Sequence, residues 1–214
     1  MIADWRRYPV ITAVVLFAVL LVPPMQHALT ASMATQMLVQ IPLLIAVGWL
    51  LRGTLPPWLV AVTDAWNHNG ITGLLLAAFA AAFWMLPRSL DAAIGEPLMI
   101  VAKLVSVPLL IGLPLGLSWP RMGFVVRGLF LSELIAMFFR IGWVYLVSQV
   151  RLCSNYLLDD QQRTGEYMLI IGGVILIWAV IKLLWGHFDS LPNDHPITTS
   201  RLHDPHQLGH HAQH

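Results

Sequence analysis

The sequence predicts an all-α membrane protein: a polytopic transmembrane helix bundle of about six spans, with a short interfacial helix and a flexible, histidine-rich C-terminal tail. The composition is 57% hydrophobic but only 11% charged, whereas soluble domains carry about a quarter charged residues. Polar side chains are therefore too few to cover the apolar mass. Apolar runs of membrane-spanning length recur along the chain, and prolines stand between them, where helices are expected to end.

Six apolar runs are long enough, or nearly so, to cross the hydrocarbon core of a bilayer. They are residues 8–22, 33–51, 70–86, 98–119, 123–150 and 167–185. The first run is short and follows Arg6 and Arg7, and we interpret it as a retained signal anchor. The fifth is long enough to tilt or to extend beyond the membrane. We expect residues 1–186 to form the bundle and residues 187–214 the polar tail.

The segment 58–68 differs from these runs because it begins apolar and then becomes polar. Trp58 and Trp66 lie near its ends, while Asp64, Asn67 and His68 lie in its second half. Tryptophan favours the head-group region of a bilayer. The segment therefore predicts a helix lying at the membrane surface, and a further crossing is the alternative.

Lysine and arginine are distributed unevenly between the ends of the predicted spans. The inner side would hold Arg6, Arg7, Arg52, Arg121, Arg127 and Lys182, and the outer side Arg88, Arg151 and Arg163. Because cytoplasmic loops are enriched in positive charge, we expect a bacterial-type inner membrane protein with both termini in the cytoplasm. The net charge is +1 and no basic cluster exceeds Arg6-Arg7, so no nucleic-acid partner is expected.

Two groups of residues could bind a metal ion. Met25, His27, Met33 and Met37 lie in an expected turn between the first two spans, which would face outward. Thioether and imidazole groups suit copper(I), although methionine also fills gaps in a core and a histidine can simply cap a loop. The second group lies in the tail. It consists of His203, His206, His210 and His214, and such tracts either bind zinc, copper or nickel or carry no ligand.

Ionisable residues inside the predicted spans are further candidates for a functional role, separate from metal binding. Glu133 and Arg140 are seven residues apart and share one helix face, and Lys103 lies about one turn inside the fourth span. Such residues are costly in a membrane and are candidates for function. They could line a polar cavity, or Glu133 and Arg140 could pair with each other or with Lys103. Lys103 could also extend its amino group to the membrane surface.

The expected loop before the last span carries Asp159, Asp160, Gln161 and Gln162. Acidic residues near a helix N-terminus interact favourably with the helix dipole, and the same cluster could form a surface for a partner. The sequence contains no glycine-rich phosphate loop, no His-Glu-x-x-His and no Gly-x-Ser-x-Gly. We therefore do not expect an enzyme.

Residues 31–38, with the run that follows them, and residues 160–165 carry two motifs that resemble those of the CtaG family of cytochrome c oxidase assembly factors. Residues 31–38, Ala-Ser-Met-Ala-Thr-Gln-Met-Leu, are followed by Ile-Pro-Leu-Leu at 41–44 and resemble the family's His-Met-x-x-His-Met and proline-leucine run. Residues 160–165, Asp-Gln-Gln-Arg-Thr-Gly, are similar to the family's Asp-Gln-Gln-x-x-Gly. Ser32 and Gln36 replace both motif histidines, and hydroxyl and amide groups are poor copper ligands.

The resemblance implies a membrane protein that holds copper(I) transiently and passes it to a haem-copper oxidase or another respiratory membrane complex. The alternative is a non-catalytic accessory subunit, bound stably in a respiratory or monooxygenase complex in the lipid bilayer. The two replaced histidines favour this alternative. A third reading is a small transporter with Lys103, Glu133 and Arg140 around a cavity, but no inverted repeat is apparent.

Overall fold

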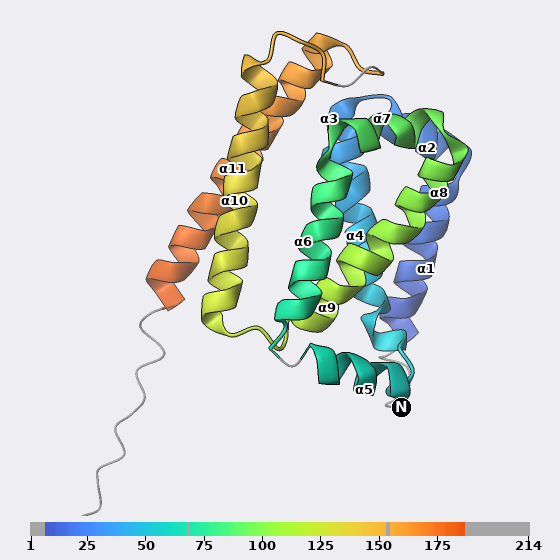
Figure 1. Ribbon diagram of the computed structural model, residues 1–214, viewed down its shortest axis with the longest axis vertical. Helices are drawn as coiled ribbons and strands as arrows, with labels where there is room; N and C mark the ends of the chain where they lie inside the picture. Colours follow the sequence, from blue (N-terminus) through green and yellow to red (C-terminus); the bar gives the residue numbers. More distant parts are fainter. Residues whose placement is uncertain (1–6, 68, 153–154, 187–214) are drawn as a thin grey trace, which may run out of the picture. The chain divides into compact units, whose positions relative to one another are not determined.

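The computed structural model describes residues 7–67, 69–152 and 155–186, which form helices with no strand among them (Figure 1). In chain order the elements are α1 (Arg7–Leu21), α2 (Pro23–Thr30), α3 (Met33–Thr35), η1 (Gln36–Gln40), α4 (Ile41–Leu51), η2 (Arg52–Thr54), α5 (Pro57–Trp66), α6 (Ile71–Met85), α7 (Pro87–Gly95), α8 (Pro97–Ser106), η3 (Val107–Gly112), α9 (Leu113–Ser118), α10 (Phe124–Val147) and α11 (Leu158–Gly186). The chain divides into two compact units, residues 1–177 and 178–214. The described part of the second unit is the C-terminal end of α11, and all contacts below belong to the first unit.

Among the described residues, three continuous helical stretches are long and apolar enough to cross a membrane: Met33–Thr54, Pro97–Ser118 and Leu158–Trp185. Two bent pairs bring the number to five if each counts as one span. These are Tyr8–Leu21 with Pro23–Thr30, bent by 74°, and Pro57–Trp66 with Ile71–Met85, bent by 91°. The prediction of an all-α protein with several membrane-length helices is confirmed. The expected fifth span coincides with α10, which is not among these candidates.

Large apolar side chains cover much of the outer surface. Phe79, Leu98 and Val125 are 74%, 79% and 78% exposed, and many other aliphatic and aromatic residues are similarly uncovered. Exposing this surface to water would be unfavourable, because its apolar area is larger than the isolated apolar patches found on soluble monomers. The surface is the one expected of helices that contact lipid.

Two of the membrane-length helices contain a wide π-helical turn. The turn η1 precedes Pro42, and its end is marked by the Ile41 N–H, which donates to the carbonyl of Gln36, five residues earlier. The turn η3 precedes Pro114, and there the Leu113 N–H donates to the carbonyl of Pro108. Proline has no N–H and its ring clashes with the carbonyl four residues before it, and a wide turn relieves both problems without breaking the helix.

A close helix contact joins α4 to η3 through two glycines. A Cβ atom on Gly48 would lie 2.1 Å from the carbonyl oxygen of Pro108 and 2.8 Å from Cα of Gly112. A Cβ on Gly112 would lie 2.3 Å from the carbonyl oxygen of Ile45. Small residues permit this approach of two backbones, as in membrane helix pairs generally.

Two segments differ from the sequence-based expectations, and a third element, α7, was not predicted. The expected turn at residues 25–37 contains α2 and α3, because Pro23 and Pro24 fix helical φ angles at the first positions of α2. The region between the third and fourth spans forms α7, whose Leu90 and Ala93 are buried. The expected loop before the last span is already helical from Leu158. In Figure 1, α5 and α7 lie at opposite ends of the neighbouring helices.

Candidate functional site

The candidate copper ligands Met25, His27, Met33 and Met37 lie on α2, α3 and η1. Met25 is 38% exposed and His27 is also exposed, whereas Met33 and Met37 are 0% and 2% exposed. The Sδ atom of Met37 accepts a hydrogen bond from the Tyr145 hydroxyl at 3.8 Å. Met33 and Met37 therefore pack in the core, whereas Met25 and His27 lie on the surface. The structure does not gather the four side chains in one exposed cradle.

The two residues at the positions of the family's histidines have structural contacts instead. Ser32 has an extended backbone, and its Oγ accepts from the Thr35 N–H at 3.2 Å, so it caps α3. Gln36 is fully buried, and its Oε1 accepts a 2.7 Å hydrogen bond from the Tyr156 hydroxyl. Its Nε2 has no partner among the described residues. Each residue thus has a local structural contact.

A chain of polar side chains runs through the interior from α8 to α2. The Nζ of Lys103 donates to Oε1 of Gln40 at 2.8 Å, and Nε2 of Gln40 donates to Oε1 of Gln26 at 3.1 Å. Gln26 in turn donates to the carbonyl of Leu20. Lys103 and Gln40 are both 0% exposed. The interpretation of Lys103 as a residue that reaches the membrane surface is thus wrong, since Gln40 provides a buried acceptor.

The acidic and amide cluster at the start of α11 contacts the α2–α3 region. Oδ2 of Asp160 accepts from the Met33 N–H at 2.6 Å. Gln161 is buried, and its Oε1 accepts from the Leu152 N–H at 2.9 Å. Asp159 is exposed and Gln162 is half-buried. The two stretches that resemble the CtaG family, 31–38 and 160–165, are therefore in direct contact.

Replacing Asp160 by alanine is expected to lower the free energy of unfolding by about 2 kcal/mol. The substitution removes a charge-assisted hydrogen bond and leaves the Met33 N–H without its acceptor. The measurement is the apparent melting temperature of the purified protein in mild detergent. Asp159→Ala is the matched control, because the adjacent carboxylate is exposed, and it should change little. Equal melting temperatures for the two variants would contradict this role for Asp160.

Glu133 and Arg140 form a salt bridge with each other on α10. Their side chains are 67% and 65% exposed, and among the described residues neither bonds to Lys103. The structure therefore contains the direct ion pair between Glu133 and Arg140, which was one of the alternatives considered from the sequence. In the described part of the chain, neither residue pairs with Lys103. The structure does not gather the three residues around one polar cavity.

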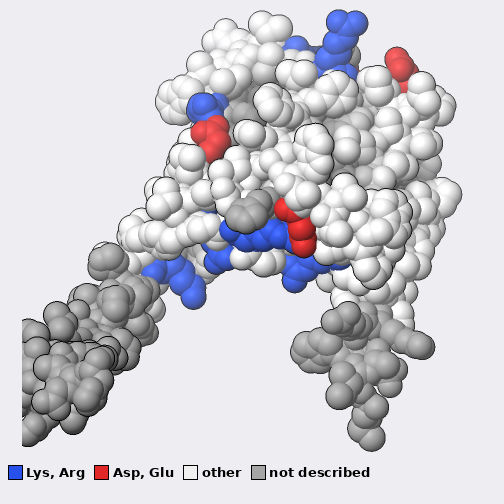
Figure 2. Space-filling view, turned by 60° about the horizontal axis from the view of Figure 1, so that its bottom comes forward, with Lys and Arg blue, Asp and Glu red and all other residues white. Residues whose placement is uncertain are grey.

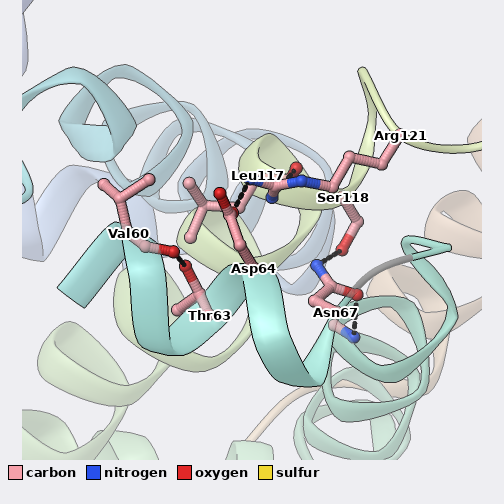
Figure 3. A network of polar contacts seen from close by, with 8 residues as sticks. Val60, Thr63, Asp64, Asn67, Leu117, Ser118 and Arg121 are labelled. Atoms are coloured by element: carbon pink, nitrogen blue, oxygen red, sulfur yellow. Dashed lines mark hydrogen bonds and ion pairs between the residues drawn. The ribbon is translucent and has the colours of Figure 1, made fainter. Parts of the chain in front are cut away.

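A second polar cluster lies where α5, α6 and α9 meet (Figure 3). Asn67 donates to Oγ of Ser118 at 2.8 Å and accepts from the Gly73 N–H at 3.0 Å, and Arg121 forms a salt bridge with Asp64. These contacts attach the end of α5 to the start of α6 and the end of α9.

Two further arginines extend this cluster along the same end of the helices. The Arg52 guanidinium lies 5.2 Å from the ring centroid of Trp49, and that of Arg127 lies 5.6 Å from the ring of Trp119. The ring centroids of Trp49 and Trp119 are 5.8 Å apart. Figure 2 shows Lys and Arg side chains gathered along the end that faces the viewer.

Sequence reasoning missed Gln36, Gln40, Tyr145 and Tyr156 as members of the buried network. The available signal was the presence of two glutamines, four residues apart, inside an apolar run. The candidate tail ligands His203, His206, His210 and His214 lie outside the described residues. Within residues 7–67, 69–152 and 155–186, no group of three or more His, Cys, Asp or Glu side chains could hold a metal ion.

Comparisons with known proteins do not identify a relative of this chain. No protein-family model matches it, and searches of curated proteins and of solved structures find no match.

Proposed function

We propose that this chain is a multi-pass membrane protein that serves, without catalysis of its own, the assembly of a respiratory copper enzyme such as a haem-copper oxidase. The observation that carries the proposal is the contact between the stretches 31–38 and 160–165, through Asp160 and the Met33 N–H. These stretches resemble two motifs of the CtaG family, and the hydrogen bond between them means that both help to hold the same region of the fold together. The proposal thus rests on the resemblance and on the packing of its residues.

The proposed topology has six spans, with α10 as the fifth, α5 at the inner surface and both termini in the cytoplasm of a bacterial-type cell. Arg52, Arg121 and Arg127 support this orientation, because they lie with Trp49 and Trp119 at one end of the helices. Trp58 and Trp66 of α5 are 65% and 76% exposed, which suits a helix at the head-group level.

The alternative form is a stably bound accessory subunit, a function different from assembly, and the packing of the motif residues supports it. Met33 and Met37 pack in the core, and Ser32 and Gln36 are engaged in a helix cap and a hydrogen bond. Purification in mild detergent from the native host tests this form. A stoichiometric respiratory or monooxygenase complex should accompany the chain. If the chain elutes alone while the oxidase of a deletion strain lacks copper, it acts instead as a transient assembly factor.

Holding and handing over copper(I) is the mechanism by which the chain would serve assembly, and it requires α3 and η1 to move so that Met33 and Met37 become accessible. With this mechanism, the Met33→Leu/Met37→Leu double variant should bind copper(I) at least tenfold more weakly than the wild type. The measurement is competition with a chromogenic copper(I) chelator. Met122→Leu is the matched control, because Met122 is also buried but lies in the turn between α9 and α10. Equal affinity in all three proteins would exclude a site at Met33 and Met37.

A further inference from the structure

Three arginines surround the C-terminal end of α9, where the last carbonyls of a helix have no partner inside it. Each donates one guanidinium N–H to a carbonyl there: Arg52 to Gly116 at 3.2 Å, Arg121 to Leu117 at 2.9 Å and Arg127 to Trp119 at 3.0 Å. A guanidinium has five N–H donors. Arg52 and Arg127 therefore keep donors with no partner among the described residues, and the Nε of Arg127 is one of them.

Two of these three arginines also carry a charge that no carboxylate of the described residues neutralises. Arg121 forms a salt bridge with Asp64, whereas Arg52 and Arg127 form none in that part of the chain. Arg52 is exposed and Arg127 is half-buried, so an anion from outside the chain can approach both. The site thus offers positive charge and free donors without an acidic group of its own.

A pair of tryptophans holds the two guanidinium groups in the same region. The guanidinium of Arg52 lies 5.2 Å from the ring centroid of Trp49, and that of Arg127 lies 5.6 Å from the ring centroid of Trp119. The two centroids are 5.8 Å apart. The carbonyls that the two arginines bond are three residues apart, which makes them neighbours on a helix surface. One tetrahedral oxyanion can therefore accept hydrogen bonds from both guanidinium groups.

The same end of the helices carries side chains that favour the head-group region of a bilayer. The helix α5 is attached here through the salt bridge of Asp64 with Arg121. Its Trp58 and Trp66 are 65% and 76% exposed, and tryptophan favours the level of lipid headgroups. Figure 2 shows further Lys and Arg side chains at this end. The oxyanion nearest to such a surface is the phosphate of a lipid.

We propose that Arg52 and Arg127 bind the phosphate of an anionic phospholipid in the leaflet at this end of α9. The fork of a guanidinium matches the spacing of phosphate oxygens, so two arginines can bind one phosphate through several charge-assisted hydrogen bonds. A zwitterionic headgroup suits the site less well, because its own cation would be repelled by the two arginines. The proposal rests on the proposed membrane placement and on no role in enzyme assembly.

Native mass spectrometry of the full chain in mild detergent tests the site with lipids that differ only in the headgroup. Phosphatidylglycerol should bind about tenfold more tightly than phosphatidylcholine with the same acyl chains. The Arg52→Gln/Arg127→Gln variant should lose this preference, and Arg88→Gln, on α7 at the opposite end of the helices (Figure 1), should keep it. An equal preference in all three proteins, or none in the wild type, would overturn the proposal. Binding of inorganic phosphate as tightly as phosphatidylglycerol would overturn a lipid as the ligand.

The two arginines also contact the end of α9, so a second measurement uses the unaltered chain in nanodiscs. Phenylglyoxal modifies accessible guanidinium groups, and peptide mass mapping locates the modified residues. Phosphatidylglycerol in place of phosphatidylcholine should slow the modification of Arg52 and Arg127 several-fold, and should slow that of Arg88 much less. Equal protection of the three arginines, or no protection, would overturn the site. Neither experiment involves an oxidase, so failure of this lipid site is distinguishable from failure of the proposed function.

Discussion

Replacing Gln40 by leucine is expected to lower the free energy of unfolding by about 3 kcal/mol, the largest effect of any polar substitution considered. The Nζ of Lys103 has only donors, it is fully buried, and its described hydrogen bond goes to Oε1 of Gln40. Removing that acceptor leaves a buried polar group without a partner, which costs more than the hydrogen bond itself contributes. The measurement is reversible denaturation in detergent micelles, followed by tryptophan fluorescence.

A second substitution distinguishes this cause from simple loss of an amide. Lys103→Met in the Gln40→Leu background removes the stranded amino group, so the double variant should lie within about 1 kcal/mol of the wild type. Gln162→Leu is the matched control, because this half-buried amide makes no hydrogen bond among the described residues, and it should have little effect. Additive losses in the double variant would show that Gln40 and Lys103 do not act as a pair.

Gly48→Val is expected to cost about 3 kcal/mol or to prevent folding. The Cβ would lie 2.1 Å from the carbonyl oxygen of Pro108, and this neighbour is backbone, which cannot rotate away. The helices α4 and η3 would have to separate, losing contacts along both. Yield of monodisperse protein and apparent melting temperature measure the effect.

The control for this substitution is Gly173→Val. Gly173 also lies inside a helix, α11, but a Cβ there would meet nothing within 4 Å. Valine has a somewhat higher helix propensity than glycine, so this substitution should not lower the stability. If both variants lose the same stability, the contact between Gly48 and Gly112 is not the reason.

The helices of this protein follow from apolar runs and from prolines such as Pro23 and Pro97, because both act locally. The surroundings of Lys103 do not follow from such signals. Its position near the start of a span predicts exposure, but Gln40, 63 residues away, accepts its hydrogen bond inside the bundle. The π-helical turn at Gln36–Gln40 is also a product of context, since Pro42 perturbs the helix one turn before itself.

The candidate site was likewise predictable only in part, because its residues could be identified from the sequence but their contacts could not. The sequence singles out Met33, Met37 and Asp160, and the structure places all three in one region. Spacing on a helix cannot tell which side of the helix faces the core, so the burial of Met33 and Met37 was not predictable. Nor could it show that Asp160 accepts from the Met33 N–H, because that contact depends on the arrangement of helices at opposite ends of the chain.

The contacts between residues 33–37 and residues 145–160 have a consequence for biosynthesis. Three of them join residues far apart in sequence: Met33 with Asp160, Gln36 with Tyr156, and Met37 with Tyr145, separated by 127, 120 and 108 positions. While the chain emerges from the ribosome, the early helices insert before any of these partners has been made. The N-terminal half must therefore wait, with buried donors and acceptors unmet, until α11 arrives. These three contacts are therefore completed only after Asp160, at the start of α11, has been made.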